Sequence, residues 1–275
     1  MHTDKISIAV FRGSYKGELA VQIYLAVTPD AYQEASRYCR SIAHVAYRIG
    51  PGSTLLRQSV LLKARGGLLS VSDREAPDIG QPEALCAAVL RECGRRGCGG
   101  VLLDFEQPPR RDRIRFAQTL SAQLRASRRV LYIPERYADA VSGAVPLICT
   151  ALSGGSFRQR LQEAADARGG AGQLALDVQR LRMDFCLPAR TGQGTPLSPD
   201  EFRALKDQCS PAVFFSQELC ARYFTYTRDG EAHFVLFDDA DTLRQKLKVG
   251  AAMGFSAAFF MWPEVRDIAG QLGLR

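Results

Sequence analysis

The sequence predicts an α/β fold: a single (β/α)8 (TIM) barrel over residues 1–275, with a β-hairpin insertion near residues 221–239. Short, nearly continuous apolar runs alternate with helical patterns, which is typical of a parallel sheet covered on both faces. About eight strand–helix units fit into the chain, whose length suits a barrel of roughly 250 residues. The sequence contains no GxGxxG or P-loop motif that would indicate a nucleotide-binding open sheet.

The elements follow one another along the whole chain without a long linker or an internal repeat. The apolar runs predict strands at 6–11, 41–49, 66–72, 99–106, 129–134, 144–152, the start of 172–185, and 256–263. The helical patterns predict helices at 32–39, 81–98, 112–127, 157–167, 198–208 and 239–255.

Local signals support several of these boundaries. Pro82 stands in the first turn of its helix, and Gly94 or Gly97 stands near its end. Ser198 and Glu201 have the spacing of a capping box. Aromatic and β-branched runs flank an Asp-Gly turn at 229–230, which predicts the antiparallel hairpin of residues 221–239.

Composition narrows the class of protein. The sequence has no apolar run of 18 residues, so we expect no membrane span. The apolar stretch after the first residues is too short for a signal-peptide core. If Met1 is the native start, we expect a protein that is not secreted by the usual route.

The cysteines and histidines do not have the spacing of a metal site. None of the eight cysteines forms a CxxC pair, which favours buried free thiols over a disulfide or zinc framework. The three histidines are few and scattered, so we expect neither a metal nor an organic cofactor.

The net charge of +7 comes with many arginines, notably in residues 110–129. We interpret this segment as a helix with a solvated basic surface. Polyanion binding is the alternative, but no aromatic residues interleave the arginines, so nucleic acid is not an expected partner. Retention on heparin that vanishes with modest salt would be the minimum support for that alternative.

The run GGVLLDFE at 99–106 ends in two acids. Because side chains alternate along a strand, Leu102, Asp104 and Glu106 point to one side of the sheet. In a barrel, Leu102 would belong to the core, and the acids would lie at the C-terminal rim, where barrel enzymes keep their chemistry. Repulsion and partial burial should raise the pKa of one acid. The alternative is a strand that simply ends in solvent-exposed charge.

This run resembles the fourth-strand signature Asp-x-x-Asp-x-Asp-x-Glu of the family 18 glycoside hydrolases, the chitinase-like barrels. Asp104 and Glu106 match its last two acids, and Phe105 stands at the usual Trp. The resemblance implies substrate-assisted hydrolysis, in which the substrate's N-acetyl group attacks. It implies Glu106 as the acid/base and Asp104 as the group that orients the acetamido group.

Other segments extend the resemblance over most of the chain. MDFCLPARTG at 183–192 is similar to a Tyr-Asp-Trp-x-Leu-Pro run, and residues 223–265 are similar to the family's aromatic hairpin, Asp-Asp pair, helix with a buried Lys, and strand ending in Trp. The resemblance implies Trp262 as the floor of the sugar site and Asp73, Asp184 and Gln179 as hydroxyl contacts at the rim. The pattern is most similar to the spore cortical-fragment-lytic subgroup, and together with the lack of a signal-peptide core this leads us to expect a cytoplasmic or spore-associated protein.

Besides Phe105, the chain departs from the family pattern at several positions, and Gly99 replaces the first Asp of the signature. Leu102 replaces the middle Asp of the signature, Ala151 stands near an expected Tyr, and Gln179 stands where Pro is usual. The leading expectation is a glycosidase acting on a β-linked N-acetylglucosamine (GlcNAc) polymer, peptidoglycan being favoured over chitin. The alternative is a catalytically weak or inactive carbohydrate-binding protein on the same barrel. The oligomeric state, glycan linkage and chain length stay open.

Overall fold

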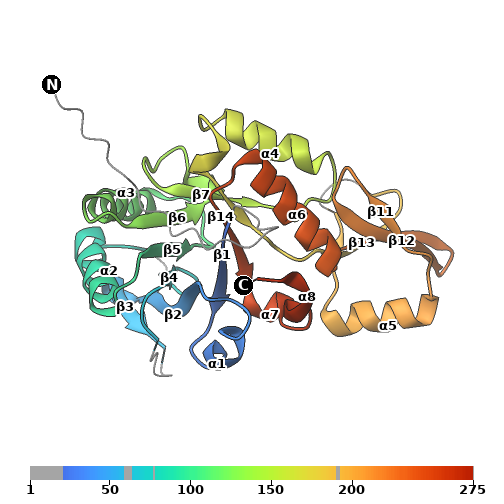
Figure 1. Ribbon diagram of the computed structural model, residues 1–275, viewed down its shortest axis with the longest axis horizontal. Coiled ribbons are helices and arrows are strands. Elements are labelled where there is room, and N and C mark those ends of the chain that lie inside the picture. Colours follow the sequence, from blue (N-terminus) through green and yellow to red (C-terminus); the bar gives the residue numbers. More distant parts are fainter. Residues whose placement is uncertain (1–20, 59–63, 77, 190–192, 275) are drawn as a thin grey trace.

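The computed structural model describes residues 21–58, 64–76, 78–189 and 193–274. Within these ranges, eight parallel strands close into a barrel (Figure 1). Around the barrel the strands are β1 (Gln22–Val27), β14 (Ala257–Met261), β8 (Ala175–Asp177), β7 (Val145–Cys149), β6 (Val130–Pro134), β5 (Gly100–Asp104), β4 (Leu68–Ser72) and β2 (Ile42–Gly50). The pairing of β1 with β2 closes the ring, which confirms the predicted barrel.

The first barrel strand lies later in the chain than the sequence indicated. The expected strand at 6–11 falls outside the described residues, and β1 occupies residues 22–27 instead. This strand is buried only in its last three residues and begins with Gln22, so it does not form a continuous apolar run. The expected helix at 32–39 is also shorter, because α1 spans only Tyr32–Ala35.

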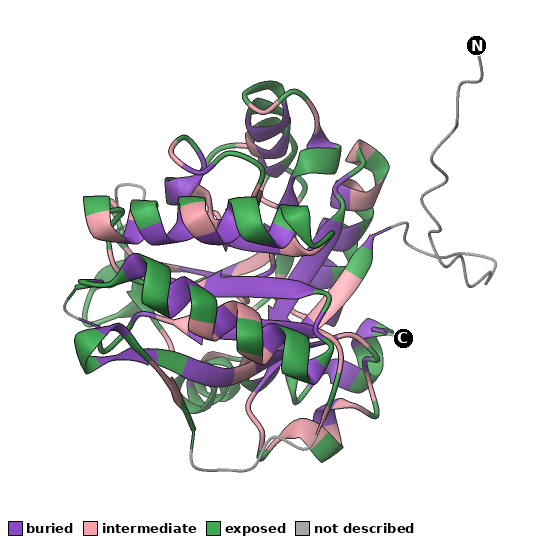
Figure 2. Ribbon diagram, turned by 90° about the vertical axis from the view of Figure 1, so that its left-hand side faces the viewer, coloured by how far each residue is buried: buried purple, intermediate pink, exposed green. Residues whose placement is uncertain are grey.

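The helices cover the outside of the barrel. They are α2 (Pro82–Arg96), α3 (Arg111–Ala126), α4 (Phe157–Asp166) and α6 (Ala240–Met253), with the short α7 (Trp262–Val265) and α8 (Ala269–Leu272) near the C-terminus. Figure 2 shows their buried residues on the side facing the strands. Gly97 ends α2 at φ 67°, a left-handed conformation that glycine adopts readily. No helix in the described ranges is long and apolar enough to cross a membrane.

Side-chain alternation divides the core into an inner and an outer part. Leu102, Tyr132 and Phe259 belong to a cluster that fills the barrel interior. Leu103 and Phe105 belong to a separate cluster that includes residues of α2 and α3. The sequence prediction that Leu102 faces inward and its neighbour outward is therefore confirmed.

The predicted hairpin is part of a larger insertion between β8 and α6. Its strands are β12 (Ala221–Arg228) and β13 (Glu231–Phe237), and β9 (Arg182–Cys186), β10 (Thr195–Pro196) and β11 (Phe214–Ser216) extend it to a five-stranded antiparallel sheet. This sheet and α5 (Pro199–Cys209) lie at one side of the barrel (right in Figure 1). The capping box at the start of α5 is confirmed: the Ser198 side chain accepts from the Glu201 amide, and the Glu201 carboxylate accepts from the Ser198 amide.

A buried ion pair ties the insertion to the barrel. Lys246 Nζ lies 2.7 Å from Asp238 Oδ2, and both side chains are 0% exposed. The same Asp238 carboxylate accepts the backbone N–H of Leu181 at 3.0 Å and the hydroxyl of Thr242 at 2.8 Å. These bonds compensate the desolvation of both charges, and they fix the start of the insertion against its end.

Candidate active site

A cavity of about 540 Å³ opens at the C-terminal ends of the barrel strands. Leu102 and Phe259 from the barrel interior form part of its lining. Its polar lining side chains come from β5, β6 and β8 or the residues that follow them, and they are Asp104, Glu106, Glu135, Arg136, Asp177 and Gln179. The structure thus brings three of the expected site residues, Asp104, Glu106 and Gln179, to one cavity at the catalytic end of the barrel.

The two acids of the β5 segment have opposite electrostatic environments. Burial raises the pKa of Asp104, and the neighbouring charge of Glu106 raises it further. Glu106 is 47% exposed and pairs with the exposed Arg74, whose Nη2 lies 2.6 Å from Oε1. The hydrogen bonds from Arg74 lower the pKa of Glu106. The expected rise in the pKa of one acid therefore holds for Asp104, whereas Glu106 is held as a carboxylate.

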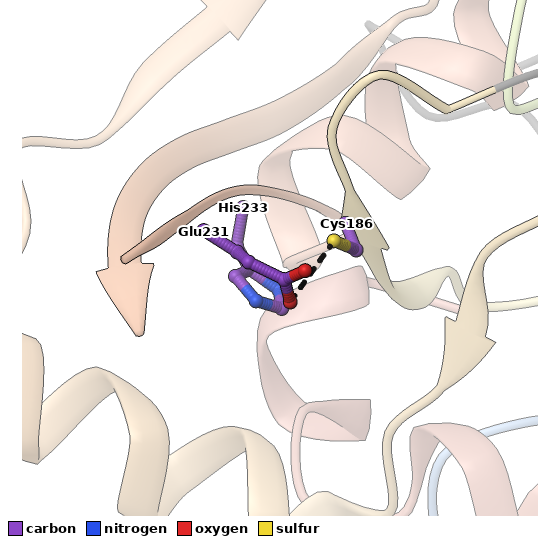
Figure 3. A group of neighbouring side chains, drawn as sticks. All are labelled: Cys186, Glu231 and His233. Carbon is purple, nitrogen blue, oxygen red and sulfur yellow. Dashed lines mark hydrogen bonds between the residues drawn. The ribbon is translucent and has the colours of Figure 1, made fainter. Parts of the chain in front are cut away.

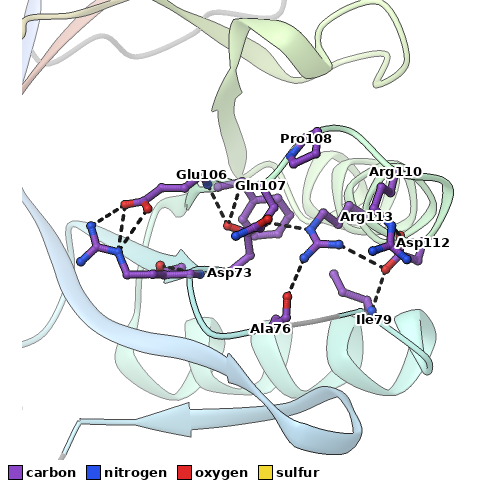
Figure 4. Close-up of polar contacts among 12 residues, drawn as sticks. Asp73, Ala76, Ile79, Glu106, Gln107, Pro108, Arg110, Asp112 and Arg113 are labelled. Atoms are coloured by element: carbon purple, nitrogen blue, oxygen red, sulfur yellow. Dashed lines mark hydrogen bonds and ion pairs between the residues drawn. The ribbon is translucent and has the colours of Figure 1, made fainter.

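Asp73 is buried and accepts hydrogen bonds from the backbone of the loop that carries Glu106, so it does not lie at the rim of the barrel. It is 0% exposed and forms an ion pair at 2.8 Å with Arg113, which is 1% exposed. Its other carboxylate oxygen accepts the backbone N–H groups of Glu106 at 2.8 Å and Gln107 at 3.3 Å (Figure 4). The expectation that Asp73 contacts sugar hydroxyls is corrected: complete burial leaves it no access to substrate, and it positions the loop that carries Glu106.

Asp177, at the end of β8, is a site residue that the sequence analysis missed. It lines the same cavity as Asp104, and the Gln179 side-chain amide donates to it at 2.7 Å. Burial raises the pKa of Asp177 to about 6, with further contributions from the negative charges of Glu264 and Asp104. The signal was present in the sequence, because LALD at 174–177 ends an apolar run in an acid just as VLLD does at 101–104.

Asp177→Asn should stabilise the folded protein at neutral pH. Burial raises the pKa of Asp177 above the ordinary aspartate value of 3.8, so the folded state binds the proton more tightly than the unfolded state, and stability falls as the pH rises from about 4 to 6. Asparagine carries no charge, so it should raise the free energy of unfolding at pH 7 by about 1–3 kcal/mol. Urea unfolding at pH 4, 6 and 7.5 measures this: the gain should vanish at pH 4, and an equal gain at all three values would contradict it.

Two other expected contacts lie away from the cavity. Trp262 is 3% exposed and packs in the outer core, with its ring centroid 5.7 Å from that of Tyr38. Because side chains alternate along β14, Met261 lines the cavity and Trp262 is turned away. Asp184 lies in the insertion sheet, where it accepts hydrogen bonds from Tyr226 and His233. The expected sugar contacts of Trp262 and Asp184 are therefore corrected.

The departures from the family pattern persist in three dimensions. Leu102 lines the cavity with an apolar side chain where the signature has an acid. Ala151 packs with Leu181 and Phe185 beside the insertion, and no tyrosine is among the described residues that line the cavity. Asp177, however, lies near enough to Asp104 for their charges to interact. A carboxyl from β8 thus lies close to Asp104, on a cavity wall where β5 itself contributes the apolar Leu102.

The other sequence expectations concern thiols and arginines. All eight cysteines lie in the described ranges as free thiols, five of them buried and Cys186 exposed.

The arginine-rich helix is only partly a solvated surface. Arg113 turns inward to Asp73, whereas Arg115 forms an exposed pair with Glu83 at 2.7 Å.

Comparison with known proteins agrees with this architecture. No protein-family model and no curated protein sequence matches the chain. Among solved structures, the spore cortex-lytic enzyme SleL of Bacillus megaterium superposes with a TM-score of 0.62 at 13% identity, over 88% of this chain and 70% of that one. A chitinase of Chromobacterium violaceum gives a TM-score of 0.64 at 16% identity, over 92% and 99%.

A third solved structure carries the family name. The GH18 chitinase of Cycas revoluta in complex with (GlcNAc)3 gives a TM-score of 0.63 at 10% identity, over 92% of this chain and 99% of that one. Bacterial and plant enzymes thus share the same arrangement of strands and helices with this chain. The chain therefore shares its barrel fold with a GH18 chitinase and with a spore cortex-lytic enzyme.

Proposed function

We propose that the protein is a glycosidase that hydrolyses a β-linked GlcNAc-containing glycan by substrate-assisted, retaining catalysis. The observation that carries this proposal is the cavity at the barrel mouth, which holds Asp104 and Glu106 at successive depths. The same cavity contains Asp177, whose pKa burial raises to about 6, whereas Arg74 lowers the pKa of Glu106, so carboxyl groups with pKa values shifted in opposite directions meet in one cavity. Perturbed carboxyls in a cleft are typical of glycosidase sites.

The proposed chemistry assigns one task to each acid. The acetamido oxygen of the substrate attacks the anomeric carbon, and the bond to the glycosidic oxygen breaks as that oxygen takes a proton from Glu106. Asp104 accepts a hydrogen bond from the acetamido N–H and holds the group in line. Water then attacks the anomeric carbon and gives a proton to Glu106, while the bond between that carbon and the acetamido oxygen breaks, which restores the acetamido group and the acid.

Glu106 must leave Arg74 before it can act as an acid. The guanidinium favours the carboxylate, whereas proton donation needs a carboxylic acid. A glycan that enters the cavity would separate the exposed pair and desolvate Glu106. Both effects raise the pKa of Glu106 toward the working pH.

Arg74→Gln should move the alkaline limb of the pH profile to higher pH. Without the guanidinium, the pKa of Glu106 rises, so the protonated form persists at higher pH. The measurement is kcat/KM against pH, which reports the free enzyme. Arg48→Gln is the matched control, because Arg48 also forms an exposed ion pair, with Glu75, at 2.7 Å. An unchanged alkaline limb in Arg74→Gln would contradict this role.

Peptidoglycan is the favoured substrate over chitin. Arg74 and Arg136 lie close enough to Asp104 and Glu106 to lower the pKa values of these acids, so two guanidinium groups lie near the mouth and can pair with carboxylates of a substrate. The peptide stems of peptidoglycan carry carboxylates, whereas chitin is uncharged. The fold similarity to a spore cortex-lytic enzyme also supports a spore-associated role. The test compares reducing ends released from spore peptidoglycan with those released from chitin oligomers at equal GlcNAc content.

One set of observations favours a second candidate function, a glycan-binding protein with little or no turnover. Arg74 holds Glu106 in its charged form, Leu102 removes one acid, and no tyrosine lines the described part of the cavity. A chromogenic GlcNAc glycoside distinguishes the two functions. Colour release that needs Glu106 indicates an enzyme, whereas glycan binding by calorimetry without release indicates a binder.

A further inference from the structure

A second group of chemically capable side chains lies in the insertion sheet, outside the barrel cavity. Cys186 of β9 stands directly opposite His233 of β13 in the strand pairing, and Glu231 lies two residues before His233 on the same face. Figure 3 shows the three side chains converging at the end of the sheet. Their potential ligand atoms all lie within 4.8 Å of one another, and Cys186 Sγ is 3.5 Å from Glu231 Oε2.

The histidine is oriented as a ligand. Its Nδ1 lies 3.1 Å from Asp184 Oδ1, which leaves Nε2 as the ring nitrogen free to bind a metal. The Tyr226 ring stacks on the imidazole at 4.7 Å, and the Tyr226 hydroxyl donates to the same Asp184 carboxylate at 2.6 Å. A carboxylate that holds the second nitrogen of a histidine is the usual partner of a metal-bound imidazole.

We propose that Cys186, Glu231 and His233 bind a zinc ion, with Asp184 as the positioning residue behind the histidine. One sulfur, one imidazole nitrogen and one carboxylate oxygen form a donor set that suits Zn²⁺. Ligand atoms in a tetrahedral zinc site lie about 3.5 Å apart, so small side-chain rotations bring these three to bonding distance. Cys186 and Glu231 are exposed, which permits those rotations and leaves the fourth position to water.

The bound ion would fasten the end of β9 to the β12–β13 hairpin. This linkage goes beyond the proposed glycosidase function, because none of the three ligands lines the barrel cavity. The spacing of cysteines and histidines along the sequence does not show the site, since its ligands come from two strands that pair across the insertion. The proposed site departs from the expectation of a metal-free protein, which rested on that spacing.

Zinc titration of the full chain without an affinity tag tests the proposal. After treatment with a chelator, the protein should take up one equivalent of Zn²⁺ in competition with a chromogenic chelator, with a Kd of about 1 μM or tighter. Cys186→Ser and His233→Gln should each weaken binding at least about 100-fold, and Asp184→Asn about 10- to 100-fold. Cys209→Ser is the matched control and should bind as the wild type does.

A second readout identifies the thiolate. Co²⁺ in place of Zn²⁺ should give a thiolate-to-metal charge-transfer band that Cys186→Ser loses and Cys209→Ser keeps. Zinc should raise the Tm of the wild type and of Cys209→Ser, but not that of Cys186→Ser. Equal zinc affinity in the wild type and Cys186→Ser, or a charge-transfer band that survives in Cys186→Ser, would overturn the assignment. Far-ultraviolet circular dichroism without metal checks that each variant is folded.

Discussion

Glu106→Gln is expected to lower glycan hydrolysis by at least about 100-fold, the lower bound for loss of a general acid. Glutamine keeps the size of the side chain but has no proton to give to the leaving oxygen. The substitution removes an exposed charge pair with Arg74, so the fold and the Tm should hardly change. Release of reducing ends from spore peptidoglycan and from GlcNAc oligomers is the measurement.

Glu83→Gln is the matched control for this variant. Glu83 also forms an exposed ion pair with an arginine, Arg115, at 2.7 Å, but it lies on α2 and lines no part of the barrel cavity. It should retain full activity. Undiminished hydrolysis by Glu106→Gln would remove Glu106 from the reaction and would contradict the proposed mechanism.

Asp73→Ala should destabilise the fold by about 3–5 kcal/mol, because it removes the buried carboxylate 2.8 Å from Arg113 and leaves that buried charge only the longer 3.5 Å contact with Asp112. It also frees the backbone N–H of Glu106 from its anchor, so activity should fall even in the molecules that remain folded. Chemical denaturation gives the loss of stability. Activity per folded molecule, measured well below the melting temperature, gives the effect on positioning.

Two further variants show whether the loss of stability comes from the burial of the ion pair or from the removal of a charge alone. Asp139 forms a 2.6 Å pair with Arg168 but is 95% exposed, so Asp139→Ala should change stability by less than about 1 kcal/mol. The double variant Asp73→Ala with Arg113→Met removes both buried charges and should recover part of the lost stability. A single Asp73→Ala variant no less stable than Asp139→Ala would refute the buried support of Glu106.

The sequence was sufficient for the barrel because its strands are buried on both faces. The run of β5 is apolar up to Asp104, those of β6 and β14 are apolar over their whole length, and helical patterns separate them. The strand β1 escaped this signal because Gln22 and Ile23 are not buried. The insertion was only partly visible, because β9 mixes Arg182 and Asp184 with apolar residues and has just one fully buried position.

One part of the candidate site could be predicted, because the alternation of side chains along a single strand determines which of them point into the cavity. Leu102, Asp104 and Glu106 follow from the period of β5 alone. Asp73 could not be placed, because its burial depends on Arg113, which lies 40 residues away in the sequence. Trp262 was misplaced because the resemblance supplied a role without the register of β14. The cluster of Cys186 and His233 depends on strand pairing within the insertion.

The central claim is that this barrel cleaves a GlcNAc-containing glycan with retention of configuration. Proton NMR of the newly formed reducing end, recorded during digestion of GlcNAc oligomers and of spore peptidoglycan strands, tests it most directly. We predict that the β-anomer appears first and then mutarotates, and that neither anomer forms with Glu106→Gln. An α-anomer formed first, or glycan binding by the wild type with no new reducing end, would contradict the claim.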